Sequence, residues 1–167
     1  MHNELTASDI KKMEEEIEYR KLVVRKNALE DVKEARAQGD LSENFEYYAA
    51  KKFKNQNESR IRYLERMIKT ATVISDDSKA DEVGMNNSVE VLFEEDGSVE
   101  TYRIVTTVRG NSLEGLVSNE SPIGKALLGH KVGDRVCVEV NPSYSYYLVI
   151  RKIDKNNDDS QDKLRSF

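Results

Sequence analysis

The sequence has no tryptophan, one cysteine and only two prolines among its 167 residues. A single cysteine, Cys137, cannot form an internal disulfide, and this agrees with a reducing compartment, so we expect a cytoplasmic protein. No apolar run reaches the length of about 18 residues that a membrane-spanning helix needs. The first ten residues also lack the basic and apolar regions of a signal peptide. These absences exclude a disulfide-stapled secreted domain and predict no contact with a membrane.

Charged residues are plentiful and unevenly distributed along the chain. The net charge is −5; residues 1–75 carry 15 basic and 14 acidic side chains, and residues 76–167 carry 11 and 17. The two parts therefore have balances of +1 and −6. Because neither part is strongly basic, we expect no attraction of the whole chain to nucleic acid, and any such contact must be local.

The first part has no proline, and its only glycine is Gly39. Thr6 or Ser8 caps a predicted helix that runs to about Gln38, and a second helix begins near Ser42. Apolar residues at helical spacing mark one face of each predicted helix: Ile10, Met13, Ile17, Val24, Ala28, Val32 and Ala35 in the first, and Phe45, Ala49, Phe53, Ile61, Leu64, Ile68 and Ala71 in the second.

The short connection at Gly39 forces these two helices to run antiparallel. Residues 1–75 are therefore predicted to form a coiled-coil hairpin, with arms roughly 45 Å long at 1.5 Å per residue. We expect a monomer, since a closed hairpin covers both apolar faces. The alternative is two arms of a helical bundle that dimerisation completes.

The second part has the period of β-structure after a polar linker, residues 76–83. Residues 84–153 are predicted to form a compact domain, which makes the fold class α+β. Alternating apolar residues predict five strands, at Ser88–Phe93, Val99–Thr107, Leu113–Val117, Arg135–Val140 and Tyr146–Ile153. Ser121 and Pro122 open a short helix as N-cap and first residue. The tail, residues 154–167, is polar and predicted to be disordered.

The connection between the two helices carries an unusual set of oxygen-bearing side chains: Asp40, Ser42, Glu43 and Asn44. Spacing alone favours a capping role, in which Asp40 caps the second helix and Glu43 completes a capping box, with Ser42 as a rival cap. A cap needs only one such side chain, however. Carboxylates of this kind also suit Mg²⁺, and two of them would complete a metal site that a partner supplies.

Basic and aromatic side chains lie within a few helical turns of this tip: Arg36, Lys51, Lys52, Lys54, Tyr47 and Tyr48. Such side chains together can hold phosphate and stack on a base. The alternative is ordinary solvation of a charged helix, which we favour for Lys54 and leave open for Arg36 and Lys51.

Residues 34–50, EARAQGDLSENFEYYAA, resemble the signature E-A-R-x-x-G-D-L-x-E-N-x-E-Y-x-A-A of the bacterial Gre transcript cleavage factors, GreA type. Residues 60–65, RIRYLE, and residues 121–129, SPIGKALLG, resemble the family as well. The resemblance extends from Leu5 to Ile153.

The resemblance implies that the hairpin enters the secondary channel of bacterial RNA polymerase and that an FKBP-like C-terminal domain docks at the channel entrance. The tip acids would help to hold a Mg²⁺ ion in the polymerase active site, where backtracked RNA is cleaved near its 3′ end. The chain would then have no cofactor of its own and would not itself be an enzyme.

Each implied role maps onto matching positions of this sequence. Asp40 and Glu43 match the metal-holding acids, and Arg36, Tyr47 and Lys51 match residues near the RNA end. Lys51 replaces a frequent arginine, which weakens a bidentate phosphate contact. Ser121, Pro122 and Ile123 match a polymerase-docking loop, for which a helix cap is the competing explanation.

The sequence also departs from the family. Residues 24–27 lack a common proline, so we expect a straighter first helix, and residues 141–145 replace a Pro-Gly-Gly turn. Three rival functions stay open: a channel-binding polymerase inhibitor, a prolyl isomerase and a dimerising structural coiled coil. The intact acid pair argues against the first, and the scarcity of aromatic residues in residues 76–153 argues against the second.

Overall fold

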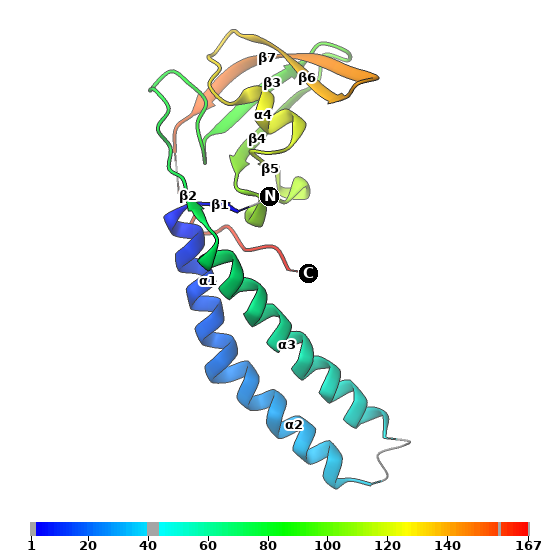
Figure 1. Ribbon diagram of the computed structural model, residues 1–167. Helices are drawn as coiled ribbons and strands as arrows, with labels where there is room; N and C mark the ends of the chain where they lie inside the picture. Colours follow the sequence, from blue (N-terminus) through cyan, green and yellow to red (C-terminus); the bar gives the residue numbers. More distant parts are fainter. Residues whose placement is uncertain (1–2, 40–43, 157, 167) are drawn as a thin grey trace. The chain divides into compact units, whose positions relative to one another are not determined.

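The computed structural model describes residues 3–39, 44–156 and 158–166 (Figure 1). It contains two compact units, a helical unit of Asp9–Ala71 and a sheet unit of Met1–Ser8 with Thr72–Phe167. The predicted α+β class is confirmed. None of the helices in the described ranges is long and apolar enough to cross a membrane.

The division differs from the predicted one at the N-terminus and at the linker. Strand β1 (Glu4–Leu5) pairs in parallel with strand β2 (Thr72–Val73), and this pairing assigns the N-terminal residues to the sheet unit. Sequence reasoning missed both strands because each has only two residues, too few to show a period.

The helical unit is an antiparallel hairpin, as predicted (Figure 1). Its first arm is formed by α1 (Ala7–Tyr19), the π-helical segment η1 (Arg20–Val24) and α2 (Arg25–Ala37). Its second arm is α3 (Phe45–Lys69), which lies beside α2.

The π-helical segment explains which residues of the first arm are buried. Met13 is buried, and a strict seven-residue repeat through Ile17 and Val24 would next bring the polar Asn27 and Asp31 to the inner face. Ala28 and Ala35 are buried there instead, with Val32 partly buried. One extra residue in a π-turn shifts the later part of the helix by one position. The segment thereby turns the apolar residues of α2 toward α3.

Asn57 of α3 holds this π-turn in place. The Arg20 carbonyl accepts the N–H of Arg25, five residues later, and also the Asn57 side-chain amide at 3.3 Å. The Arg20 guanidinium in turn donates to Asn57 Oδ1 at 3.0 Å. We expected a straighter helix because proline is absent near Val24, yet the α-helical pattern is interrupted there by tertiary contacts.

A buried ion pair beside Asn57 fixes the register of the two arms. Arg60 Nε lies 2.8 Å from Glu16 Oε2, and the Arg60 side chain is only 8% exposed. Arg20 donates to the same carboxylate at 2.7 Å. Burial alone would raise the pKa of Glu16, but the hydrogen bonds and charges of both arginines lower it. A slip of either arm would leave these charges buried without partners.

The packing face of α3 differs from the prediction near the tip. Phe45 and Phe53 were assigned to the inner face, but they are 85% and 51% exposed, and Ala49 is also exposed. The inner positions are taken by Tyr47 and Asn57, both buried. The predicted positions Ile61 and Leu64 are confirmed as buried. Apolar character misled the prediction because two of the inner positions are polar or amphipathic.

Deleting Val23, an exposed residue of the π-segment, is expected to leave stability nearly unchanged, within about 1 kcal/mol. The helix would become regular while the residues on both sides keep their faces. Deleting Glu30 within α2 is the matched control, and it should cost about 2 kcal/mol or more because Val32 and Ala35 leave the interface. Chemical denaturation measures both. A loss for the Val23 deletion as large as for the control would contradict this account of the π-turn.

The larger sheet of the sheet unit has five strands in the order β5-β4-β3-β7-β6. Their bounds are Ser88–Phe93 (β3), Val99–Val105 (β4), Leu116–Ser118 (β5), Arg135–Asn141 (β6) and Tyr144–Asp154 (β7). Helix α4 (Pro122–Leu127) contacts β6 and β5, and its buried Leu127 joins the core under the sheet.

All five strands were predicted, although β5 begins three residues later than expected. The short helices η2 (Thr107–Arg109) and η3 (Ser112–Glu114) occupy the stretch before it. The predicted hairpin between β3 and β4 is confirmed, with Gly97 at φ +72° in its turn. This left-handed conformation suits glycine.

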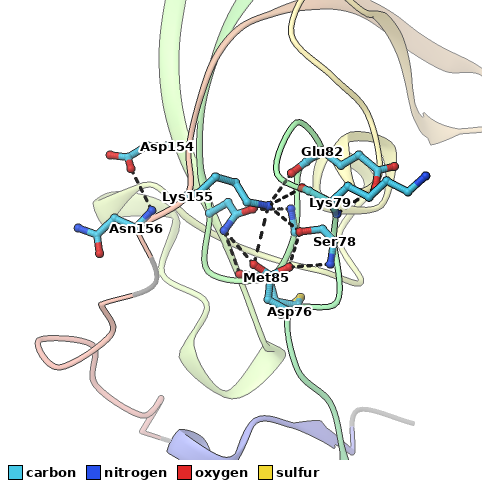
Figure 2. A network of polar contacts seen from close by, with 10 residues as sticks. Asp76, Ser78, Lys79, Glu82, Met85, Asp154, Lys155 and Asn156 are labelled. Atoms are coloured by element: carbon cyan, nitrogen blue, oxygen red, sulfur yellow. Dashed lines mark hydrogen bonds and ion pairs between the residues drawn. The ribbon is translucent and has the colours of Figure 1, made fainter.

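The predicted linker is tied to the sheet unit by polar contacts (Figure 2). The Lys155 ammonium donates to Ser78 Oγ at 2.6 Å and to the Glu82 carbonyl at 2.7 Å. Asp76 accepts the Ser78 hydroxyl and lies 3.9 Å from Lys155 Nζ. Gly84 permits this approach, because a Cβ at that position would lie 2.0 Å from Asp76 Oδ1. Residues 76–84 therefore form an anchored loop of the sheet unit.

Replacing Lys155 with methionine is expected to lower the free energy of unfolding by about 1–3 kcal/mol, because oxygen acceptors in the loop lose a charged donor. The control is Lys152→Met, a change at an exposed position of β7. Thermal and urea unfolding compare the two variants. Equal stability of both variants would show that Lys155 does not hold the loop.

Candidate functional site at the hairpin tip

The tip is the turn between α2 and α3. Helix α2 ends at Ala37, and the N–H of its C-cap, Gln38, donates to the Ala35 carbonyl at 3.2 Å. Gly39 follows with φ +149°, and a Cβ at this position would meet no atom within 4 Å. The predicted metal-holding residues Asp40 and Glu43, together with Ser42, lie outside the described residues.

Asn44 closes the tip from the other side. Its Oδ1 accepts the Tyr47 N–H at 3.0 Å and so caps α3, while its Nδ2 donates to the Ala35 carbonyl at 2.6 Å. One side chain thus caps one helix and binds the last turn of the other. The expectation that Asp40 or Ser42 caps the second helix is wrong, because the N-cap of α3 is Asn44.

Three residues predicted to lie near RNA come together on the first turns of α3 and the last turn of α2. The Arg36 guanidinium carbon lies 5.5 Å from the Tyr47 ring centroid, and its Nη2 lies 3.5 Å from the Tyr47 hydroxyl. The hydrogen bond from Arg36 lowers the pKa of Tyr47, and the charges of Lys51 and Lys54 act in the same direction, while partial burial opposes them. Arg36, Tyr47 and Lys51 therefore form one cationic cluster.

Two more aromatic side chains lie beside this cluster: Tyr48, which the sequence indicated as a residue that can stack on a base, and Phe45, which was predicted to face the other arm. Tyr48 is 50% exposed and meets the Tyr47 ring edge-on at a centroid distance of 5.4 Å. Phe45, directly after the cap, is almost fully exposed. Phe45 and Tyr48 do not fall on the seven-residue repeat that places Tyr47 and Asn57 on the inner face. This difference in spacing is the sequence signal that could have identified both as exposed residues of the tip.

A hollow of about 310 Å³ near the tip is lined by Asp31, Glu34, Ala35, Gln38, Glu46 and Ala50. Three of these side chains are carboxylates. Within the described ranges, however, no three or more Asp, Glu, His or Cys side chains gather closely enough to hold a metal ion. A metal-binding role for Asp40 and Glu43 stays a prediction.

The predicted docking residues lie at the start of α4 in the sheet unit. Ser121 Oγ accepts the Gly124 N–H at 3.1 Å and donates to the Ser118 carbonyl at 2.6 Å. A Cβ on Gly124 would lie 2.0 Å from the Ser118 carbonyl oxygen, so this contact requires glycine. Pro122 is exposed, and Ile123 is partly buried against the core. The capping role of Ser121 is confirmed, and a docking role for the three residues stays a prediction.

These features define a class of protein in which a helical hairpin presents a polar turn and a separate sheet unit follows. Two family profiles match the chain: "Transcription elongation factor, N-terminal" over residues 3–73, and "Transcription elongation factor, GreA/GreB, C-term" over residues 77–155. The chain belongs to the GreA/GreB family of transcription elongation factors.

Curated relatives agree with this assignment. The chain is 46% identical over 136 residues to transcription elongation factor GreA of Geobacillus kaustophilus, covering 81% of this chain and 86% of the relative. It is 40% identical over 156 residues to GreA of Lachnoclostridium phytofermentans, covering 93% and 97%. A solved structure, GreA factor homolog 1 (Gfh1) of Thermus thermophilus, is 26% identical with a TM-score of 0.40, covering 90% of this chain and 97% of that one.

Asn44→Ala is expected to lower the free energy of unfolding by about 1 kcal/mol, the usual effect of losing an N-cap. It should also speed hydrogen exchange at the Tyr47 amide, which would lose its acceptor. Asn55→Ala, at an exposed position inside α3, is the control and should be neutral or slightly stabilising, because alanine favours helix. Unchanged exchange at Tyr47 in the Asn44 variant would contradict the capping role.

Proposed function

We propose that the protein inserts its hairpin tip into the secondary channel of bacterial RNA polymerase and stimulates the polymerase's own cleavage of backtracked RNA. Elongation then restarts from the new 3′ end. The proposal rests on family membership and on the signature in residues 34–50. The chain supplies groups to another protein's active site and is not itself the nuclease.

The capping role of Asn44 is the single structural observation that carries this proposal. Spacing alone favoured a purely structural role for Asp40 and Glu43. Because Asn44 caps α3 and also binds α2, neither acid is needed as the cap of that helix. This observation weakens the capping explanation for both acids and supports the metal-binding role that the signature implies.

The residues of the tip have distinct roles in this proposal. Asp40 and Glu43 bind a Mg²⁺ ion that they share with the polymerase, and a second metal in such a site activates water and stabilises the leaving oxygen. Arg36 and Lys51 attract the phosphates at the RNA 3′ end. Tyr47, held by Arg36, keeps the cationic cluster in position beside the acids. In the sheet unit, Ser121, Pro122 and Ile123 contact the polymerase at the channel entrance.

Stalled, backtracked elongation complexes provide the test. With Mg²⁺ present, the wild-type protein should release short 3′ RNA fragments faster than the polymerase alone. Asp40→Asn and Glu43→Gln should each reduce this stimulation by about 100-fold or more, since each removes a ligand charge at the reacting centre. Both variants should still compete with the wild type for polymerase.

Glu46→Gln is the matched control, because Glu46 is an exposed acid on the first turn of α3 outside the proposed ligand pair. It should stimulate cleavage like the wild type. Polymerase binding without cleavage by the wild-type protein would instead identify a channel-binding inhibitor. Equal cleavage by the wild type and both acid variants would refute the metal-binding role.

A further inference from the structure

Two arginines of the sheet unit form a pair next to the C-terminal tail. Arg103 lies on β4, and Arg109 ends η2 with its side chain fully buried. Asn86 Oδ1 accepts from Arg109 Nη1 at 2.8 Å and helps to orient it. Buried arginine is costly unless carboxylates pair with it, so the chemistry of this pair calls for an anionic ligand.

The chain's own tail supplies that ligand, although it was predicted to be disordered. One carboxylate, Asp162, bridges both guanidinium groups: one oxygen binds Arg103, and the other lies 2.9 Å from Arg109 Nη1. The Asp158 carbonyl accepts from Arg103 at 2.7 Å, and Asp159 Oδ2 lies 3.8 Å from Arg109 Nη1. The arrangement is a built carboxylate site.

The tail is attached mainly by charge and hydrogen bonds. The Asp162 side chain is 8% exposed, and Leu164, the one apolar side chain among the described tail residues, is only partly buried. The main chain of the tail donates from the Arg165 N–H to the Val108 carbonyl at 2.7 Å. A cavity of about 250 Å³ is lined by Arg109, Asn111 and Leu116 on one side and by Lys163, Leu164 and Arg165 of the tail. Segments with so few apolar contacts open at low free-energy cost.

An exposed apolar side chain lies four residues after Arg109 in the sequence. Leu113 of η3 is 96% exposed, and its neighbour Glu114 lines the same cavity as Arg109. We infer that Arg103, Arg109 and Leu113, here called the arginine face, form a docking surface for an acidic segment of a partner protein, and that the tail occupies this surface in cis.

The contacts that the tail makes favour a peptide over nucleic acid as the partner. Besides the Asp162 carboxylate, the sheet unit binds the main-chain carbonyl of Asp158 and accepts the main-chain N–H of Arg165 at the Val108 carbonyl, and a phosphate backbone has no N–H to offer there. The Asp162 carboxylate gives one oxygen to each of the two guanidinium groups, and the exposed Leu113 would contact an apolar neighbour of such an acid. The family match ends at residue 155. The arginine face therefore lies within the matched residues, while the tail residues that would compete with a partner for it lie beyond them.

The test uses the full-length protein and a fluorescent peptide with the sequence of residues 158–166. Asp159→Asn with Asp162→Asn in the protein should weaken the cis contact. This double variant should then bind the peptide at least about tenfold more tightly than the wild type, because a tethered competitor has a high effective concentration. Asp158→Asn is the control and should behave like the wild type, since Asp158 binds Arg103 through its main-chain carbonyl.

Further binding measurements identify the chemical class of the ligand. A peptide with asparagine in place of Asp159 and Asp162 should bind the double variant at least about tenfold more weakly, as should the acidic peptide when Arg103→Gln is added. Equal binding of both peptides, or equal binding by the double variant and the wild type, would overturn the proposal. Competition by an RNA oligonucleotide or inorganic phosphate as effective as that of the acidic peptide would indicate a phosphate site and would also overturn it.

Tail release in the wild-type protein gives a second measurement should the double variant unfold. An excess of acidic peptide with glutamine in place of its lysine and arginine, which trypsin cannot cleave, should displace the tail and speed trypsin cleavage after Lys163 and Arg165 severalfold. The same peptide with asparagine in place of Asp159 and Asp162 is the control. A cleavage rate that does not respond to the acidic peptide would show that the tail is a fixed part of the fold.

Discussion

The ion pair between Glu16 and Arg60 at 2.8 Å, with Asn57 beside it, determines how the two arms of the hairpin align. Apolar contacts alone would tolerate a slip along the arms, because small and branched side chains are exchangeable in a helical interface. A buried charge does not tolerate it, since the slip would leave the arginine without its carboxylate. In paired helices, a buried polar layer of this kind typically selects one alignment of the two helices over the alternatives.

The alignment extends from this layer to the tip. Asn57 binds the carbonyl that the π-turn exposes, and the extra residue of that turn brings Ala28 and Ala35 to the inner face. Ala35 then presents its carbonyl to Asn44, which also caps α3. The same arrangement places Arg36 over the Tyr47 ring. The cationic cluster and the ends of the acidic turn are therefore positioned by contacts several helical turns away.

Charged side chains play a similar part in the sheet unit. Lys155 binds the loop that follows β2, and Asp162 bridges two arginines beneath the tail. In both cases residues distant in sequence are joined by charge-assisted hydrogen bonds with little apolar burial. Such contacts are directional and can be exchanged for equivalent ones in a partner. The predicted linker and the described residues of the tail therefore both contact the sheet unit.

The sequence by itself determined the antiparallel hairpin, the five strands, the Ser121 cap and the family, because these depend on local period, turn residues and a contiguous motif. Only the tertiary structure decided that Phe45 and Phe53 face outward, that Asn44 and not Asp40 caps α3, and that Arg109 is buried under Asp162. Asn44 also binds Ala35 of the other arm, and Asp162 is distant in sequence from Arg109, so these outcomes depend on how separate elements pack together. Local periodicity carries no information about which polar residue a buried charge will meet, so such pairs emerge only when the arms and strands are packed.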